Sequence, residues 1–303
     1  MQYNHSQRIS RLRRGASPSC HPTYPSMILF PNAKINLGLN VVRRRPDGYH
    51  DIETLFYPVP WRDVLEIVPA KGETTTLTVT GREVDCPPEK NLVMKAYNAL
   101  NALSPLPPVD IYLQKIIPDG AGLGGGSADA SFTLRGLNRM FSLGYNDEEL
   151  AAVATTIGAD CPFFIYNIPM IATGIGNVFT PLDLNLSSMT VAIVKPPVSV
   201  STKEAYSGIT PAQPAINLRS TLLDPVECWH DALKNDFEES IFPLHPQIAE
   251  VKDKLYRLGA DYAAMSGSGA SVFGLFTDGG DILADTIRKT FPGCDTLVSP
   301  LTL

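Results

Sequence analysis

The chain has 303 residues, of which 44% are hydrophobic and 18% charged, as is typical of a globular protein with one large domain or two. Its net charge of −6 argues against a general surface for nucleic acid or an anionic membrane, so we expect neither partner. No apolar run approaches the roughly 18 residues that a membrane span requires. Any phosphate binding must therefore be local.

Cysteine usage indicates the compartment. The five cysteines are Cys20, Cys86, Cys161, Cys228 and Cys294. They are odd in number, far apart and without CxxC spacing, so they predict neither a disulfide framework nor a zinc site. We therefore expect a cytoplasmic protein. Separately, we expect it to be either a monomer or a weak homodimer.

Residues 1–26 differ from the rest of the chain. They are polar and basic, lack hydrophobic periodicity, and precede a second methionine, Met27. They contain no apolar core of the kind a secretory signal needs. An organellar transit peptide and a mis-assigned start codon both explain them, so we expect residues 1–26 to be disordered or artefactual.

Segment 34–42 alternates between apolar and polar residues, which predicts a half-buried strand. Lys34 and Asn36 lie on its polar face, about 7 Å apart. A turn of Pro, Asp and Gly at 46–48 is followed directly by Tyr49 and His50. The polar pair Lys34 and Asn36 could face either solvent or a ligand. Tyr49 and His50 could have either a structural or a functional role.

Residues 118–131, PDGAGLGGGSADAS, place five glycines within seven positions, between a predicted strand at 111–117 and a helical pattern. Glycine permits positive φ and leaves no Cβ in the way, so successive amides can converge on an oxyanion. The following helix N-terminus adds partial positive charge. The stretch predicts a phosphate-binding loop.

Three other interpretations of this loop fit less well. A Walker loop needs lysine where Gly126 stands. A dinucleotide fingerprint is literally present, but the acidic residue about 20 positions on, Asp147, begins a helix instead of ending a strand. A flexible linker would not join an apolar strand to a helix with an apolar face.

Asp160 is the only acid in an apolar neighbourhood at 150–168, after a helix capped by Asn146 with Glu149 three residues on. A helix cap ahead of Pro162 and a chemical role both explain it. The region 169–188 is the predicted domain transition, giving domains at 27–180 and 181–303. Farther on, predicted strands 262–265 and 271–276 flank a small-residue loop, Ser-Gly-Ser-Gly-Ala at 266–270.

Five motifs together resemble one family. They are FPNAKIN from Phe30, RPDGYH from Arg45, the glycine loop, IGADCPFF from Ile157 and SGSGA from Ser266. They are similar to the GHMP kinases and, within them, to the 4-diphosphocytidyl-2-C-methyl-D-erythritol kinases of non-mevalonate isoprenoid biosynthesis. The resemblance implies an α+β two-domain GHMP kinase fold with its site in the interdomain cleft, and ATP-dependent phosphorylation of the substrate's 2-hydroxyl.

The resemblance also implies roles for individual residues. Asp160 would accept the 2-hydroxyl proton, and Lys34 would keep Asp160 ionised and draw charge from the phosphoryl group. The residues implied to bind ATP with Mg²⁺ are Pro118, Gly120, Gly122, Leu123, Gly124, Gly125, Gly126, Ser127 and Ala128, Ser127 being also the candidate metal ligand. Those implied to bind the cytidyl substrate are Asn36, Tyr49, His50, Thr202 and Tyr206, with two flat rings sandwiching cytosine.

Two alternative functions are separable by sequence. A GHMP kinase for homoserine, mevalonate or a sugar predicts no Tyr-His pair after the turn. In a non-catalytic nucleotide-binding module, Lys34 or Asp160 would be replaced by another residue, and both are present here. The chain departs from the family's pattern at Asp119, whose carboxylate would repel phosphate and which we therefore expect to face solvent.

Overall fold

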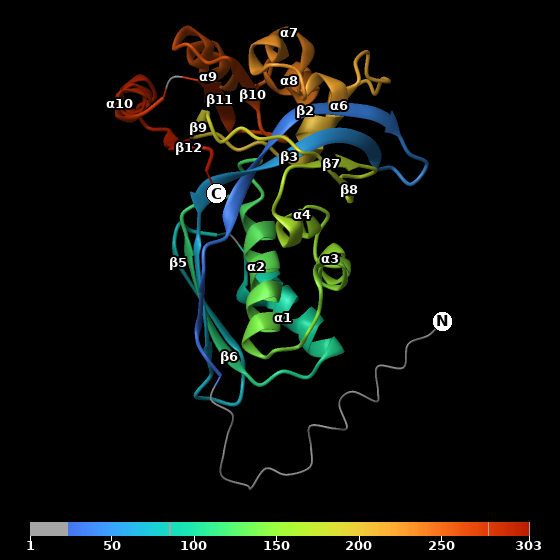
Figure 1. The fold of residues 1–303 in the computed structure, drawn as a ribbon, viewed down its shortest axis with the longest axis vertical. Helices are drawn as coiled ribbons and strands as arrows, with labels where there is room; N and C mark the ends of the chain where they lie inside the picture. Colours follow the sequence, from blue (N-terminus) through green and yellow to red (C-terminus); the bar gives the residue numbers. More distant parts are fainter. Residues whose placement is uncertain (1–23, 85, 278, 303) are drawn as a thin grey trace, which may run out of the picture.

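The structure, a computed structural model, describes residues 24–84, 86–277 and 279–302 (Figure 1). Its strands are β1 (Met27–Leu29), β2 (Asn32–Arg44), β3 (His50–Arg62), β4 (Val64–Pro69), β5 (Thr76–Gly81), β6 (Val109–Lys115), β7 (Met170–Thr173), β8 (Val178–Pro181), β9 (Thr190–Lys195), β10 (Tyr262–Met265), β11 (Val272–Phe276) and β12 (Asp295–Pro300).

Ten α-helices and two short 3₁₀ helices complete the described elements. They are α1 (Leu92–Leu103), α2 (Gly125–Met140), α3 (Asp147–Thr155), α4 (Cys161–Tyr166), α5 (Thr202–Ser207), α6 (Leu218–Thr221), α7 (Trp229–Ala232), α8 (Phe237–Ile241), α9 (Pro246–Arg257), α10 (Asp281–Thr290), η3 (Pro88–Lys90) and η4 (Val226–Cys228). Within the described ranges, none of these helices has the length and apolar character to cross a membrane.

The first sheet has the order β1-β4-β6-β5, and its only parallel pair joins β5 to β6. Helices α1 and α2 pack on one of its faces (Figure 1). The buried residues of α1, Val93, Ala96, Tyr97 and Leu100, recur at helical spacing and so form a single stripe toward the sheet. This packing fixes β6 and α2, the two elements that hold the ends of the glycine loop.

The other two sheets, β2-β3-β7-β8 and β10-β11-β9-β12, are antiparallel throughout and share one core. That core joins Ile35 and Tyr57 of the second sheet to Val191 and Phe273 of the third. Residues from both sides of position 180 therefore pack together, so the division into domains there stays a prediction. Arg82, after β5, also pairs with Asp295 of β12, at 2.6 and 3.0 Å.

Strand β2 differs from the predicted half-buried strand. Lys34 and Asn36, on its polar face, are only 3% and 2% exposed. The prediction was wrong because the polar face is also covered, by Gly122 of the glycine loop and by Ser266. Solvation therefore does not explain why these two positions are polar.

The predicted leader at 1–26 falls mostly outside the described residues, which begin at Tyr24. The ring of Tyr24 packs edge-on against Phe141, with 4.7 Å between ring centroids. Packed structure therefore begins before Met27. The predicted capping box at Asn146 and Glu149 is confirmed, since each side chain accepts a hydrogen bond from the backbone amide of the other residue.

Candidate active site

The glycine loop connects the end of β6 to α2 in a conformation that requires glycine. Gly122 and Gly124 have φ of +73° and +71°, in the left-handed region. A Cβ on Gly122 would lie 2.0 Å from the carbonyl oxygen of Ser266, and one on Gly124 2.9 Å from the Phe164 ring. Among the described residues no side chain caps the first amides of α2, so these amides offer a binding site for an anion.

Lys34 reaches the loop from β2. Its Nζ donates to Asn36 Oδ1 at 2.6 Å and to the Gly122 carbonyl at 2.8 Å. Ser266 Oγ donates to that same carbonyl at 2.8 Å. Three segments that the sequence singled out separately therefore meet at Gly122.

The environment of Lys34 changes its acidity. Burial lowers the pKa of Lys34, and the negative charge of Asp160 raises it in part. The ammonium also lies 4.9 Å from the centre of the Phe56 ring. Lys34 is thus a partly desolvated cation, which an added anionic ligand would stabilise.

Asp160 occupies the N-cap position of α4, but its side chain makes no capping hydrogen bond. Pro162, the second residue of the helix, has no amide proton that would need a capping acceptor. The side chains of α4 that follow, including Phe163 and Phe164, are buried. A cap role therefore does not account for the carboxylate of Asp160, which lines a cavity instead.

This reaction cavity has a volume of about 330 Å³ and brings many of the predicted residues together. The predicted residues that line it are Lys34, Asn36, Gly120, Gly122, Gly124, Asp160, Thr202 and Tyr206. The SGSGA loop contributes 267–269. The geometry supports a site in which an anionic group lies between Lys34, Asp160 and the loop.

The other predicted phosphate-loop residues do not line the cavity. Leu123 and Ala128 are buried in apolar cores. Pro118 is also buried, and Gly125, Gly126 and Ser127 are half-buried. Asp119 is exposed, as we expected.

Four of the five predicted cytidyl-binding residues, all but Asn36, line a second cavity of about 720 Å³, the aromatic cavity. They are Tyr49, His50, Thr202 and Tyr206. Thr202, Tyr206 and Ile175 also line the reaction cavity, so the two cavities adjoin. The rings of His50 and Tyr206 stack on each other, with centroids 4.6 Å apart and planes 16° apart. No planar base fits between these two rings at that spacing.

A third cavity, of about 600 Å³, was not predicted from the sequence. It is lined by Leu77 and Val79 of β5, residues 80–84, Cys86 and the N-cap Asn91 of α1. It lies near the glycine loop, since a Cβ on Gly126 would be 3.7 Å from Leu92, the residue after Asn91. No sequence motif marks this cavity, because the parallel pairing of β5 with β6 that builds it follows from topology.

Comparison with known families and proteins identifies the chain's relatives. The GHMP kinases N terminal domain matches residues 91–167, and the GHMP kinases C terminal domain matches 223–293. A 4-diphosphocytidyl-2-C-methyl-D-erythritol kinase from Parabacteroides distasonis is 59% identical, over 82% of this chain and 92% of the relative. The enzyme of that name from Cytophaga hutchinsonii is 44% identical, over 91% of this chain and 100% of the relative.

Solved structures show the same fold. A 4-(cytidine 5'-diphospho)-2C-methyl-D-erythritol kinase has a TM-score of 0.76 and 32% identity, covering 90% of this chain and 98% of its own. Homoserine kinase from Cytophaga hutchinsonii has a TM-score of 0.72, but its 22% identity makes the likeness one of fold alone. The predicted α+β GHMP kinase fold is confirmed.

Proposed function

The chain belongs to the 4-diphosphocytidyl-2-C-methyl-D-erythritol kinase family of the GHMP kinases, and we propose that it transfers the γ-phosphoryl group of ATP to the 2-hydroxyl of that substrate. The observation that carries this proposal is the convergence of Lys34, Asp160 and the glycine loop on one cavity that adjoins the aromatic cavity. The reaction belongs to isoprenoid precursor biosynthesis.

In the proposed reaction the 2-hydroxyl oxygen attacks the γ-phosphorus, and the bond from that phosphorus to the oxygen of ADP breaks. Asp160 accepts the hydroxyl proton as the new bond forms. Lys34 offsets the negative charge of the transferring group, and in turn favours ionised Asp160. The backbone amides of the glycine loop and the N-terminus of α2 hold the other phosphates.

The residues present fit a magnesium ion held mainly by nucleotide. Among the described residues no three His, Cys, Asp or Glu side chains cluster as a metal site. Mg²⁺ commonly takes one or two protein oxygens and completes its shell with phosphate oxygens and water. The hydroxyl of Ser127, in the first turn of α2, is the proposed protein contact. When bound, the ion would neutralise phosphate charge.

The two ends of the site are assigned to the two substrates. The 600 Å³ cavity beside α1 is of a size for the adenosine end of ATP, and the 720 Å³ aromatic cavity for the cytidyl end. Cytosine would stack between Tyr49 and Tyr206, so His50 must first leave the face of Tyr206 that it covers here. Asn36 and Thr202 would bind the erythritol or phosphate portion.

Phosphorus NMR of the product tests this function. Incubation with ATP, Mg²⁺ and the cytidyl substrate should yield ADP and one new phosphomonoester signal, while the diphosphate link of the substrate stays intact. Cleavage of that diphosphate link, or ADP formation without a phosphorylated acceptor, would contradict the proposal.

A further inference from the structure

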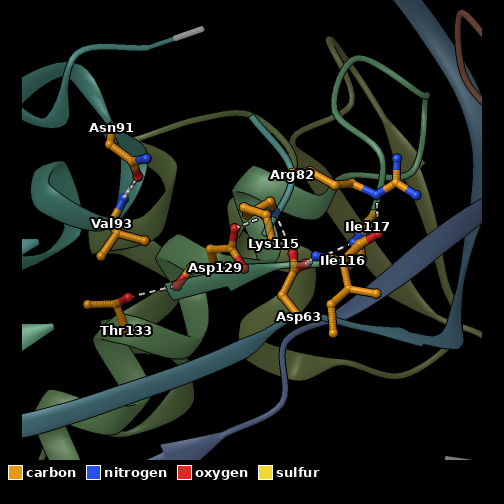
Figure 2. Close-up of polar contacts among 9 residues, drawn as sticks. All are labelled: Asp63, Arg82, Asn91, Val93, Lys115, Ile116, Ile117, Asp129 and Thr133. Carbon is orange, nitrogen blue, oxygen red and sulfur yellow. Dashed lines mark hydrogen bonds and ion pairs between the residues drawn. The ribbon is translucent and has the colours of Figure 1, made fainter. Parts of the chain in front are cut away.

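Figure 2 shows a buried group of three charged side chains, Asp63, Lys115 and Asp129. None of the three lines the reaction cavity. Lys115 ends β6 and is 5% exposed, Asp63 lies between β3 and β4 at 0%, and Asp129 lies on α2 at 2%. Lys115 Nζ donates to both carboxylates, at 2.7 Å to Asp129 Oδ2. We call these residues the Lys115 cluster.

The cluster ties together the two ends of the glycine loop. Lys115 precedes the loop and Asp129 follows it, 14 residues later, so their bond closes the loop at its base. Asp63 accepts from the amides of Ile116 and Ile117, at 2.5 and 2.8 Å, and so holds the first residues after β6 (Figure 2). The entry and exit of the loop are thus set by one buried cation.

The ammonium of Lys115 also lies close to the first turn of α2. A Cβ on Gly125 would be 3.4 Å from Lys115 Nζ. Gly125 is the first helical residue, and the first amides of a helix have no intrahelical partner. A displacement of Lys115 therefore moves the amides that would bind phosphate.

The second carboxylate of the cluster, that of Asp129, meets Lys115 through one oxygen, Oδ2. Burial, which outweighs the attraction of Lys115, raises the pKa of Asp129 to about 7. Its Oδ1 has no hydrogen-bond partner among the described residues. An uncharged side chain with one oxygen in the place of Oδ2 would thus meet the need of Lys115.

We propose that Lys115, Asp63 and Asp129 are positioning residues for nucleotide binding, which hold the glycine loop and the first turn of α2 in the shape that accepts the ATP phosphates. The inference rests on the proposed function, because it assigns those phosphates to this loop. A positioning role differs from a purely structural one because it affects the binding of one substrate and not of the other. Loss of the cluster weakens nucleotide binding and leaves the cytidyl end of the site unchanged.

Calorimetric titration with ADP and Mg²⁺ tests the proposal. Asp129→Leu, of similar volume but without an acceptor, should raise the Kd for ADP at least tenfold, while KM for the cytidyl substrate changes less than twofold. Asp129→Asn keeps an acceptor oxygen and should stay within threefold of the wild type. In Lys115→Gln the side chain is too short to span both carboxylates, so this variant should lose the same affinity for ADP as Asp129→Leu. It replaces Asp129→Leu in the test if that variant does not fold.

Leu137→Ala is the matched control. Leu137 is fully buried on the same helix, so its truncation destabilises α2 without touching the cluster. Its Kd for ADP should stay within twofold of the wild type. Wild-type affinity in Asp129→Leu and Lys115→Gln, or an equal loss in Leu137→Ala, would overturn the positioning role. Failure of the wild type to bind ADP would overturn the proposed function and this inference together.

Discussion

The Asp160 carboxylate lines the reaction cavity with no capping bond, which leaves it available for proton transfer. Asp160→Asn should lower kcat at least about 100-fold, because general-base catalysis commonly contributes 10² to 10⁴. The KM for ATP should stay within a few-fold, since the phosphates are assigned to the loop. Steady-state kinetics measure both constants.

Asp119→Asn is the control for that substitution. Asp119 also lies beside the glycine loop, but it is exposed to solvent. Its loss should change kcat less than twofold. Near-normal turnover in Asp160→Asn, or an equal loss in Asp119→Asn, would remove the support for a base at position 160.

The pH dependence of the reaction should report Lys34, which must be a cation to offset phosphate charge. Its pKa in the free protein is lowered from 10.5, chiefly by burial, so it loses its proton at lower pH than an ordinary lysine. The value of kcat/KM for ATP, which reports the free enzyme, should therefore fall with an alkaline midpoint below 10.5. The midpoint for kcat should lie higher, since bound phosphate favours the ammonium. A flat kcat/KM up to pH 10.5 would contradict this role.

For single residues, the sequence predicted which side chains belong to the site but not how deeply they are buried. Alternation placed Lys34 and Asn36 on the polar face of a strand, as observed. What covers that face comes from positions 88 residues on, at Gly122, and 230 residues on, at Ser266. Contacts of that range follow from tertiary packing, which local periodicity does not contain.

Among the elements, the glycine loop depends on the absence of a side chain at Gly122. Gly122→Ala should lower kcat/KM at least tenfold and also destabilise the fold, because its Cβ would lie 2.0 Å from the Ser266 carbonyl oxygen. Gly144 also has positive φ, +80°, but no atom within 4 Å of its Cβ position. Gly144→Ala should cost only about 1–2 kcal/mol of stability from backbone strain and leave activity unchanged. Equal activity in the two variants, measured alongside thermal unfolding, would argue against the loop's assigned role.

Helix α5 carries Thr202 and Tyr206 to the junction of the two cavities. Tyr206→Ala should raise KM for the cytidyl substrate by roughly 5- to 150-fold, since stacking on a base is worth about 1–3 kcal/mol. KM for ATP should not change. Tyr112→Ala, on a 45% exposed tyrosine of the first sheet, is the control and should change neither constant. If both KM values stay at the wild-type level in Tyr206→Ala, the stacking role is lost.

Elements with local signals were predictable, and those defined by packing were not. The capping box of α3 and the strand at 262–265 were found because their signals lie within a few residues. Helix α4 was predicted only as one alternative, a helix cap at Asp160, because six residues are too few for a periodic pattern. The stacking of His50 on Tyr206 was missed as well, since it joins α5 to the distant start of β3.

For the whole molecule, the shared core of the second and third sheets explains how the two halves build one site. Residues from both halves pack in that core, so β2 with Lys34 is held against the segment that carries Ser266. The motif resemblance predicted the family and the fold class correctly. It did not predict the order of strands in each sheet, which depends on pairing between strands far apart in sequence.

A coupled assay of ADP release with four acceptors measures the central claim most directly. The acceptors are 4-diphosphocytidyl-2-C-methyl-D-erythritol, mevalonate, homoserine and galactose. A site that holds a cytidyl group in an aromatic cavity beside Lys34 and Asp160 predicts a kcat/KM at least about 100-fold higher for the first, a difference worth about 2.7 kcal/mol. Equal or faster turnover of mevalonate, homoserine or galactose would contradict it.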